Sequence, residues 1–156
     1  KSAGKTTVGQ ALAKGLKLEF ADLDRIIEEL DNKGRTCREI YNQSGREYFR
    51  SLETNAIGFL KSRDNSVISL GGGALENKFN HPLIKQLGKV ICLDCDKNVL
   101  FERIKKDGLP KFIDSFQTFE QLYSQRSATY KDLADIILDY TNKSVEEITQ
   151  EVIAKT

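Results

Sequence analysis

Short apolar segments that alternate with helical patterns are the feature that most constrains the fold of this chain. The segments that read as strands are 18–22, 66–70, 90–93 and 136–138. Apolar residues at helical spacing fill most of the intervening sequence. Alternation of this kind predicts an α/β fold in three layers, in which helices cover both faces of a parallel sheet.

The helices are expected from apolar spacing and from capping residues. Val8, Leu12 and Leu16 repeat every four residues, so the first helix is expected over 4–16. Ser144 and Glu147 form the capping pattern that opens the last helix, over 144–153. The remaining helices are expected at 25–30, 38–41, 45–61, 83–87, around 99–103 and at 119–133, and residues 107–116 are expected to form a loop.

Composition fits one domain. The chain has 156 residues, 39% of them hydrophobic and 30% charged, without a linker or a repeat, so a single domain over 1–156 is expected. The net charge of +1 argues against nucleic acid or an anionic membrane as a partner. No apolar run approaches the roughly 20 residues of a membrane span and no signal peptide opens the chain, so the cytoplasm is the expected location.

The cysteines favour core packing over a metal or disulfide site. Cys37, Cys92 and Cys95 are an odd and sparse set, which argues against a disulfide framework. Cys92 and Cys95 spell C-x-x-C, but no second pair exists and His81 is the only histidine, which argues against zinc.

The first residues carry half of a phosphate-binding loop. Gly4-Lys5-Thr6-Thr7 at the start of a helix matches the second half of G-x-x-x-x-G-K-[ST]. Backbone N–H groups there bind the phosphates of ATP, Lys5 reaches the outer phosphates, and the Thr6 hydroxyl ligates Mg²⁺. The first glycine and the strand that the pattern requires are expected upstream of Lys1. Taken alone, the half-motif also fits an ordinary helix start.

Two carboxylates follow the strand at 18–22. Asp22 and Asp24 stand at its carboxyl end, which is where parallel sheets bind ligands. A kinase of small hydroxyl compounds needs one carboxylate to orient or deprotonate the hydroxyl and another to help hold Mg²⁺. We expect Asp24 to face the substrate and Asp22 the metal. The alternative for Asp24 is a helix N-cap.

Two arginines and a glycine run extend the candidate site. Arg50 either pairs with Glu53 at the surface or is held by Glu53 so that its guanidinium binds a substrate carboxylate. Arg126 lies on an apolar helix stripe, where it needs a partner unless it extends to solvent. The run Gly71–Gly73 follows a strand and either admits a ligand close to its backbone or forms a simple turn.

Together these motifs resemble the shikimate kinase family. They are Gly4-Lys5-Thr6-Thr7-Val8-Gly9, Asp22-Leu23-Asp24, Phe49-Arg50-Ser51-Leu52-Glu53, Leu70-Gly71-Gly72-Gly73-Ala74 and Gln125-Arg126-Ser127-Ala128-Thr129-Tyr130. The resemblance implies transfer of the ATP γ-phosphate to the 3-hydroxyl of shikimate, giving shikimate 3-phosphate and ADP on the route to chorismate and the aromatic amino acids. It also implies a P-loop nucleoside-monophosphate-kinase-like fold with a five-stranded parallel sheet of order 2-3-1-4-5, and a monomer.

The resemblance also implies residue roles. The substrate-binding region spans residues of about 24–61, and further substrate contacts come from outside it. A lid spans residues of about 105–117. Phosphate and Mg²⁺ are bound by Gly4, Lys5, Thr6 and Thr7, with Asp22 as a further metal ligand. Asp24 is the candidate base, and the other substrate contacts are Phe49, Arg50, Gly71, Gly72, Gly73 and Arg126. Arg103 matches the arginine that stacks on adenine.

One departure concerns the lid. The family has Arg-Pro-Leu-Leu there, whereas this chain has Leu109-Pro110-Lys111-Phe112, and leucine cannot stabilise transferring charge. Lys105, Lys106, Lys111 or another segment remain candidates to replace the arginine. Two rival functions remain open: a kinase of the same fold that acts on another hydroxy acid or a nucleotide, and a non-catalytic ATP-binding module.

Overall fold

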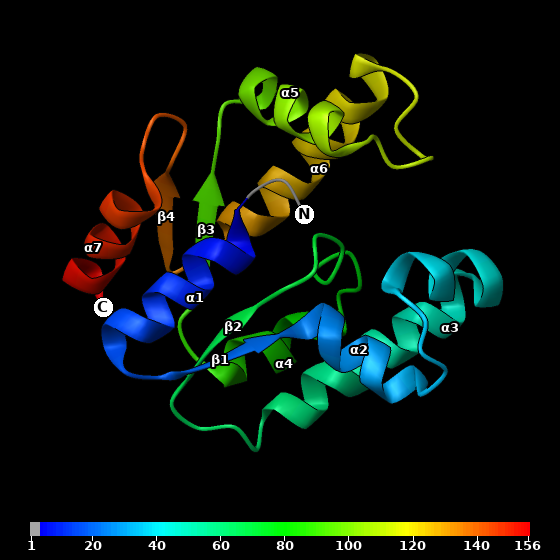
Figure 1. Ribbon diagram of the computed structural model, residues 1–156, viewed down its shortest axis with the longest axis horizontal. Helices are drawn as coiled ribbons and strands as arrows, with labels where there is room; N and C mark the ends of the chain where they lie inside the picture. Colours follow the sequence, from blue (N-terminus) through cyan, green and yellow to red (C-terminus); the bar gives the residue numbers. More distant parts are fainter. Residues whose placement is uncertain (1–3) are drawn as a thin grey trace.

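A computed structural model describes residues 4–156 as alternating strands and helices (Figure 1). The strands are β1 (Glu19–Asp22), β2 (Ser66–Ser69), β3 (Ile91–Asp94) and β4 (Ile136–Asp139). The helices are α1 (Lys5–Leu16), α2 (Leu23–Asp31), α3 (Cys37–Leu60), α4 (Asn80–Leu87), α5 (Lys97–Asp107), α6 (Phe116–Leu133) and α7 (Val145–Lys155). Every strand and helix expected within residues 4–156 is present, and residues 108–115 form the expected loop between α5 and α6.

The strands form two parallel pairs. β1 pairs with β2, with Asp22 opposite Ser69, and β3 pairs with β4, with Asp94 opposite Asp139. Within residues 4–156 no ladder joins β2 to β3. The two pairs correspond to strands 2-3 and 4-5 of the expected order, and the strand expected as the first of the sheet lies outside the described residues.

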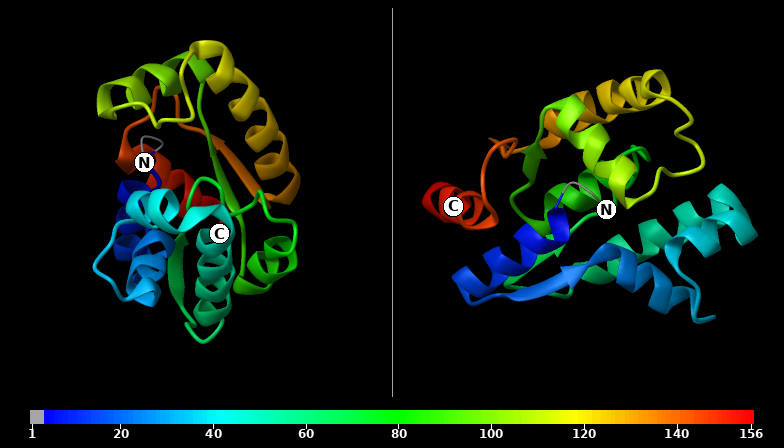
Figure 2. Two further views of the ribbon diagram at one scale, coloured as in Figure 1. Left: turned by 90° about the vertical axis from the view of Figure 1, so that its right-hand side faces the viewer. Right: turned by 45° about the horizontal axis from the view of Figure 1, so that its top comes forward.

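Two apolar cores hold the strands against the helices. One core joins β1 to α2, α3 and α4, and its fully buried side chains include Leu23, Ile27 and Ile57. The other joins α1 and α7 to the β3–β4 pair through residues such as Val8, Leu138 and Val152. Figure 2 shows α5 and α6 on the opposite side of the molecule from α2 and α3.

α3 consists of two helical stretches that meet at a kink. The kink is at Gly45, whose φ of 85° and ψ of 169° are not helical, so the division expected between 38–41 and 45–61 is present within α3. A left-handed φ is easily adopted by glycine because it has no Cβ. Thr36 and Glu39 form a capping box at its start, as Ser144 and Glu147 do for α7.

The cysteines lie where core packing places them. Cys92 and Cys95 are buried, and Cys37 is partly buried. No group of three or more His, Cys, Asp or Glu side chains in residues 4–156 is arranged to hold a metal ion. None of the helices described for this chain is both long and apolar enough to cross a membrane.

Two glycine-to-alanine substitutions should change stability in opposite directions. A Cβ at Gly9 in α1 would lie 2.7 Å from Cε2 of Phe20 in β1, so Phe20 must move and the free energy of unfolding should fall by about 1 kcal/mol. Gly58 in α3 is exposed and a Cβ there meets nothing within 4 Å, so Gly58→Ala should raise it by about 0.5–1 kcal/mol. Urea unfolding of both variants checks this, and equal stabilisation by both would contradict the close contact of α1 with β1.

Candidate active site

A small polar niche lies where β1 and β2 end beside the first turn of α1. Its volume is about 40 Å³, and it is lined by Lys5, Thr6, Asp22, Asp24, Ser69, Leu70, Gly71 and Gly72. Because β1 and β2 are parallel, their carboxyl ends meet at the same edge, and the chain segments after both strands reach the niche. The structure thus brings residues of the Gly-Lys-Thr motif, the two aspartates and the glycine run to one place.

The first turn of α1 supplies the positive side of the niche. Gly4 caps the helix with a left-handed φ of 70°, and the first backbone N–H groups of a helix lack partners within it. Partial positive charge at this end favours an anion. Burial lowers the pKa of Lys5 below its ordinary value, and the negative charge of Asp24 opposes that change. A phosphate bound at the first turn of α1 would stabilise the Lys5 ammonium, which burial has partly removed from water.

The two aspartates have different surroundings. Asp22 accepts a hydrogen bond from the Thr6 hydroxyl at 3.2 Å and, as the N-cap of α2, another from the Asp24 backbone N–H at 3.0 Å. Asp24 is therefore not the N-cap of α2 and its carboxylate is free of that function. The alternative considered for Asp24 is wrong because Asp22, with an extended backbone one residue before the helix, is the residue that can cap it.

Asp24 has the electrostatics of a group that accepts a proton. Burial, and next the nearby negative charge of Asp22, raise the pKa of Asp24 above its ordinary value. A raised pKa makes a carboxylate a better proton acceptor. The expected role of Asp24 on the substrate side of the site is compatible with these surroundings and stays a prediction.

Thr6 and Asp22 together fit a magnesium site. A hydroxyl and a carboxylate oxygen lie 3.2 Å apart at the niche, and Mg²⁺ prefers oxygen ligands. Mg²⁺ in kinases commonly takes one or two protein ligands and completes its shell with water and phosphate oxygens. The donor set at α1 and β1 matches that pattern.

Each glycine of the run Gly71–Gly73 makes room for a different functional side chain. A Cβ on Gly71 would lie 2.7 Å from Oδ1 of Asp24, and a Cβ on Gly72 would lie 3.3 Å from Nη1 of Arg126. A Cβ on Gly73 would lie 2.6 Å from Nη2 of Arg50. The run is therefore more than a turn, because it lets three polar side chains approach one stretch of backbone.

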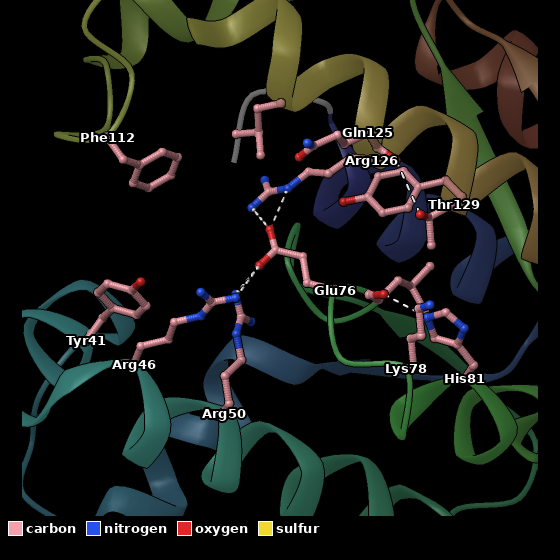
Figure 3. A pocket seen from close by; sticks show the side chains of 13 residues that line it. Tyr41, Arg46, Arg50, Glu76, Lys78, His81, Phe112, Gln125, Arg126 and Thr129 are labelled. Carbon is pink, nitrogen blue, oxygen red and sulfur yellow. Dashed lines mark hydrogen bonds and ion pairs between the residues drawn. The ribbon is translucent and has the colours of Figure 1, made fainter.

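A larger cavity of about 520 Å³ lies beside the glycine run, between α3 and α6 (Figure 3). Its walls come from the two helices, the segment after the glycines, α4 and the loop 108–115. The lining residues are Tyr41, Arg46, Arg50, Leu75, Glu76, Lys78, His81, Phe112, Leu122, Gln125, Arg126, Thr129 and Tyr130. Arg50 and Arg126, from helices far apart in the sequence, thus share one cavity, as expected.

Arg50 is held by a buried carboxylate. Its Nη1 donates to both carboxylate oxygens of Glu53 at 2.9 and 2.8 Å, and the Glu53 side chain is only 2% exposed. Burial raises the pKa of Glu53, and the positive charge of Arg50 opposes that change. Of the two interpretations given for this pair, the structure rules out a surface ion pair. Glu53 orients the guanidinium into the cavity.

Arg126 finds its partner across the cavity and not in solvent. Its Nε and Nη2 donate to Oε1 of Glu76 at 3.0 and 2.6 Å, and Nη2 of Arg50 donates to Oε2 of the same glutamate at 2.8 Å. Tyr130, one turn after Arg126 in α6, donates to the carbonyl oxygen of Gly72. Glu76 therefore joins the two arginines in this structure.

Sequence reasoning missed Glu76 and Asn80. Glu76 follows the glycine run by only three residues, but nothing in the local pattern indicates that it meets residues 26 and 50 positions away. Asn80 is fully buried, donates to the Ala74 carbonyl and accepts from the Thr54 hydroxyl, so it ties the glycine segment to α3. From the sequence alone, an asparagine at the start of a helix is interpreted as a helix cap. The hydrogen bond between Asn80 and Thr54 therefore could not be predicted.

Phe49 lies next to Arg50, whose Cζ is 5.6 Å from the centre of the Phe49 ring. Phe49 is 9% exposed and packs edge-on against Tyr41, one of the aromatic side chains that line the cavity. Arg103 in α5 stacks over the ring of Tyr140 and its Nη2 donates to the Thr141 carbonyl at 3.4 Å. Both residues keep their expected roles as predictions.

The loop expected to act as a lid brings an aromatic side chain to the cavity. Phe112 lines it on the side of Tyr41, as Figure 3 shows, and is 59% exposed. The three lysines considered as replacements for the family's lid arginine, Lys105, Lys106 and Lys111, are exposed. The structure assigns none of them to the niche.

Comparison with known proteins agrees with these features. A family model described as shikimate kinase matches residues 1–156. A shikimate kinase of Sulfurihydrogenibium sp. is 34% identical over 98% of this chain and 91% of the relative, and one of Bacillus anthracis is 38% identical over 98% and 92%. The structure of shikimate kinase from Acinetobacter baumannii in complex with shikimate has a TM-score of 0.89 at 29% identity, covering 99% of this chain and 87% of that chain.

Neutralising Asp24 should stabilise the fold at neutral pH. The pKa of Asp24 is raised in the folded state, so its ionised form is less favourable there than in the unfolded chain. We expect Asp24→Asn to raise Tm at pH 7 by about 2–4 °C, the shift that ~1 kcal/mol gives in a domain of this size. The difference between variant and wild type should shrink as the pH falls towards 3.8, where both states of the wild type become protonated. A variant less stable than wild type at pH 7 would contradict the assigned burial.

Proposed function

The chain belongs to the shikimate kinase family, an ATP-dependent family that phosphorylates a hydroxyl of shikimate in aromatic amino acid biosynthesis, and from this premise we propose how its residues perform the reaction. The observation that carries the proposal is the glycine run, against which Asp24, Arg126 and Arg50 all pack. The run thereby places a hydroxyl-directed carboxylate in the niche beside two carboxylate-binding guanidinium groups in the larger cavity. Shikimate carries both a carboxylate and hydroxyl groups.

Arg50 and Arg126 position the substrate by its carboxylate. A guanidinium forms paired hydrogen bonds to a carboxylate, which fixes orientation as well as charge. Glu53 holds Arg50 from behind, so the arginine enters the complex already oriented. Gly72 and Gly73 lie against Arg126 and Arg50, Gly71 lies against Asp24, and Phe49 packs against Tyr41 in the cavity wall; we assign all four to the substrate site.

Asp24 orients the 3-hydroxyl and accepts its proton. Its raised pKa and its place beside Lys5 suit a base that acts on a hydroxyl directed at the terminal phosphate of ATP. Phosphoryl transfer has a loose transition state, so positioning and neutralisation of charge supply most of the catalysis. Gly4, Lys5, Thr6 and Thr7 hold the phosphates through backbone N–H groups and the Lys5 ammonium.

Mg²⁺ is the metal that the Thr6 hydroxyl and the Asp22 carboxylate would hold. When bound, it would neutralise phosphate charge during transfer. The hydrogen bond between Thr6 and Asp22 orients both oxygen ligands in advance. This assignment leaves Asp24 free for the substrate.

The remaining assignments concern the nucleotide, the lid and the cell. Arg103 stacks on the adenine of ATP, residues about 24–61 form the substrate-binding region, and residues about 105–117 close over the site to exclude water. Phe112 is the lid side chain already at the cavity. We further propose that the single domain acts as a monomer in the cytoplasm on small molecules, without nucleic acid or a membrane.

Asp24→Asn should abolish most of the shikimate-dependent turnover. Loss of a general base that touches the hydroxyl should lower kcat by about 10²–10⁴-fold, with little change in KM for ATP. Release of ADP, with and without shikimate, measures this. Asp64→Asn removes the same charge from an exposed loop and should leave kcat unchanged. Full turnover in Asp24→Asn, with its Tm intact, would exclude Asp24 as the base.

Arg126→Ala should weaken binding of shikimate much more than binding of ATP. Loss of a charge-assisted pair of about 1.5–3 kcal/mol corresponds to a rise in KM for shikimate of about 10–100-fold. Arg38→Ala removes an exposed arginine of α3 and serves as the control. An unchanged KM for shikimate in Arg126→Ala would favour a different acceptor, because a nucleotide needs no pair of arginines on one carboxylate.

A further inference from the structure

Glu76 is hydrogen-bonded to both of the arginines that are assigned to the substrate carboxylate. Its Oε1 accepts from Nε and Nη2 of Arg126, and its Oε2 accepts from Nη2 of Arg50 at 2.8 Å. Figure 3 shows its carboxylate between the two guanidinium groups. The group bound to both arginines in this structure is therefore a carboxylate of the protein itself.

A substrate carboxylate and Glu76 compete for the same N–H groups. Glu76 takes the Nε and Nη2 side of Arg126, and Arg50 divides its two Nη atoms between Glu53 and Glu76. A guanidinium has five N–H groups and no acceptor, so a second carboxylate at these positions requires the first to leave. Two carboxylates held side by side would also repel each other.

A further arginine, Arg46, lies close enough to be an alternative partner for the Glu76 carboxylate. Nη2 of Arg46 lies 3.9 Å from Oε2 of Glu76, and the Arg46 side chain is 68% exposed. Glu76 lies in the turn segment between Gly73 and α4 and its side chain is 28% exposed. Rotation of this side chain towards Arg46 would release both deeper arginines without a change in the backbone.

The arginines do not depend on Glu76 for their positions. Glu53, which is buried, holds Arg50 by two hydrogen bonds, and Arg50 also packs against Gly73. Arg126 lies on α6 against Gly72. Removal of the Glu76 charge should therefore free the carboxylate site and leave it formed.

We propose that Glu76 is a specificity residue that fills the carboxylate site of the free protein and is displaced towards Arg46 by the carboxylate of the substrate. This proposal rests on the assignment of Arg50 and Arg126 to that carboxylate. An internal carboxylate sets a threshold, because a small anion that makes no further contact gains little by displacing it. Shikimate exceeds the threshold because its hydroxyl groups contribute contacts with the rest of the site.

Glu76→Gln tests the proposal, since glutamine keeps the size of the side chain and removes its charge. We expect KM for shikimate, and its Kd by calorimetry on the full chain without ATP, to fall by about 3–10-fold, with KM for ATP unchanged. Inhibition by sulfate should strengthen by a similar factor. Glu47→Gln removes an exposed charge from α3 and should change none of these values.

An unchanged or raised Kd for shikimate and for sulfate in Glu76→Gln, with Tm retained, would overturn the proposal, because Glu76 would then only support the arginines. Glu76→Ala is the second variant and should move both constants in the same direction as Glu76→Gln. Arg46→Ala should raise KM for shikimate, since the displaced carboxylate loses its second partner.

A failure of the proposed function can be distinguished from a failure of the proposal for Glu76. If Arg126→Ala leaves shikimate binding unchanged, the assignment of the arginines to the substrate is wrong. Sulfate then still reports whether Glu76 fills the arginine pair, because tighter sulfate binding in Glu76→Gln requires that occupancy and an unchanged sulfate Kd excludes it.

Discussion

The close approach of side chains to the backbone of the glycine run is the interaction on which the site depends. Oδ1 of Asp24 and the guanidinium groups of Arg126 and Arg50 stand where a Cβ of Gly71, Gly72 or Gly73 would meet them. The run connects β2 to α4, and Asn80 anchors it to α3. Because these contacts come from the first turn of α2, from α3 and from α6, the glycines bring three separate parts of the chain to one place.

The site concentrates charges that the protein by itself solvates poorly. Burial lowers the pKa of Lys5 and raises those of Asp24 and Glu53, so the ionised form of each is less favourable than in water. Bound phosphate and substrate supply charges of the opposite sign or hydrogen bonds. The fold therefore gives up some stability at the place where ligands restore it.

The sequence predicted the order of strands and helices because apolar spacing is local and strong in segments such as α1 and β2. It also predicted that Asp22 and Asp24 stand at the carboxyl end of a strand, where parallel sheets bind ligands. It left open whether Asp24 caps α2, because that depends on the residue at which the helix begins. The contacts of Glu76 could not be predicted for another reason. Its partners are brought to it by tertiary packing, and tertiary packing produces no periodic pattern in the residues next to Glu76.

The separation in sequence of the contacts around Glu76 has a consequence for the time course of folding. Its partners stand 26 and 50 positions away, whereas the β1–β2 pair and its helices lie within the first half of the chain. Contacts between distant segments form after local ones because they close longer loops. A polypeptide that has been synthesised only as far as α5 holds Glu76 and Arg50 but not Arg126. The cavity is thus completed only when α6 packs against the rest of the chain, so binding of a substrate by both arginines requires that α6 has been synthesised and has docked.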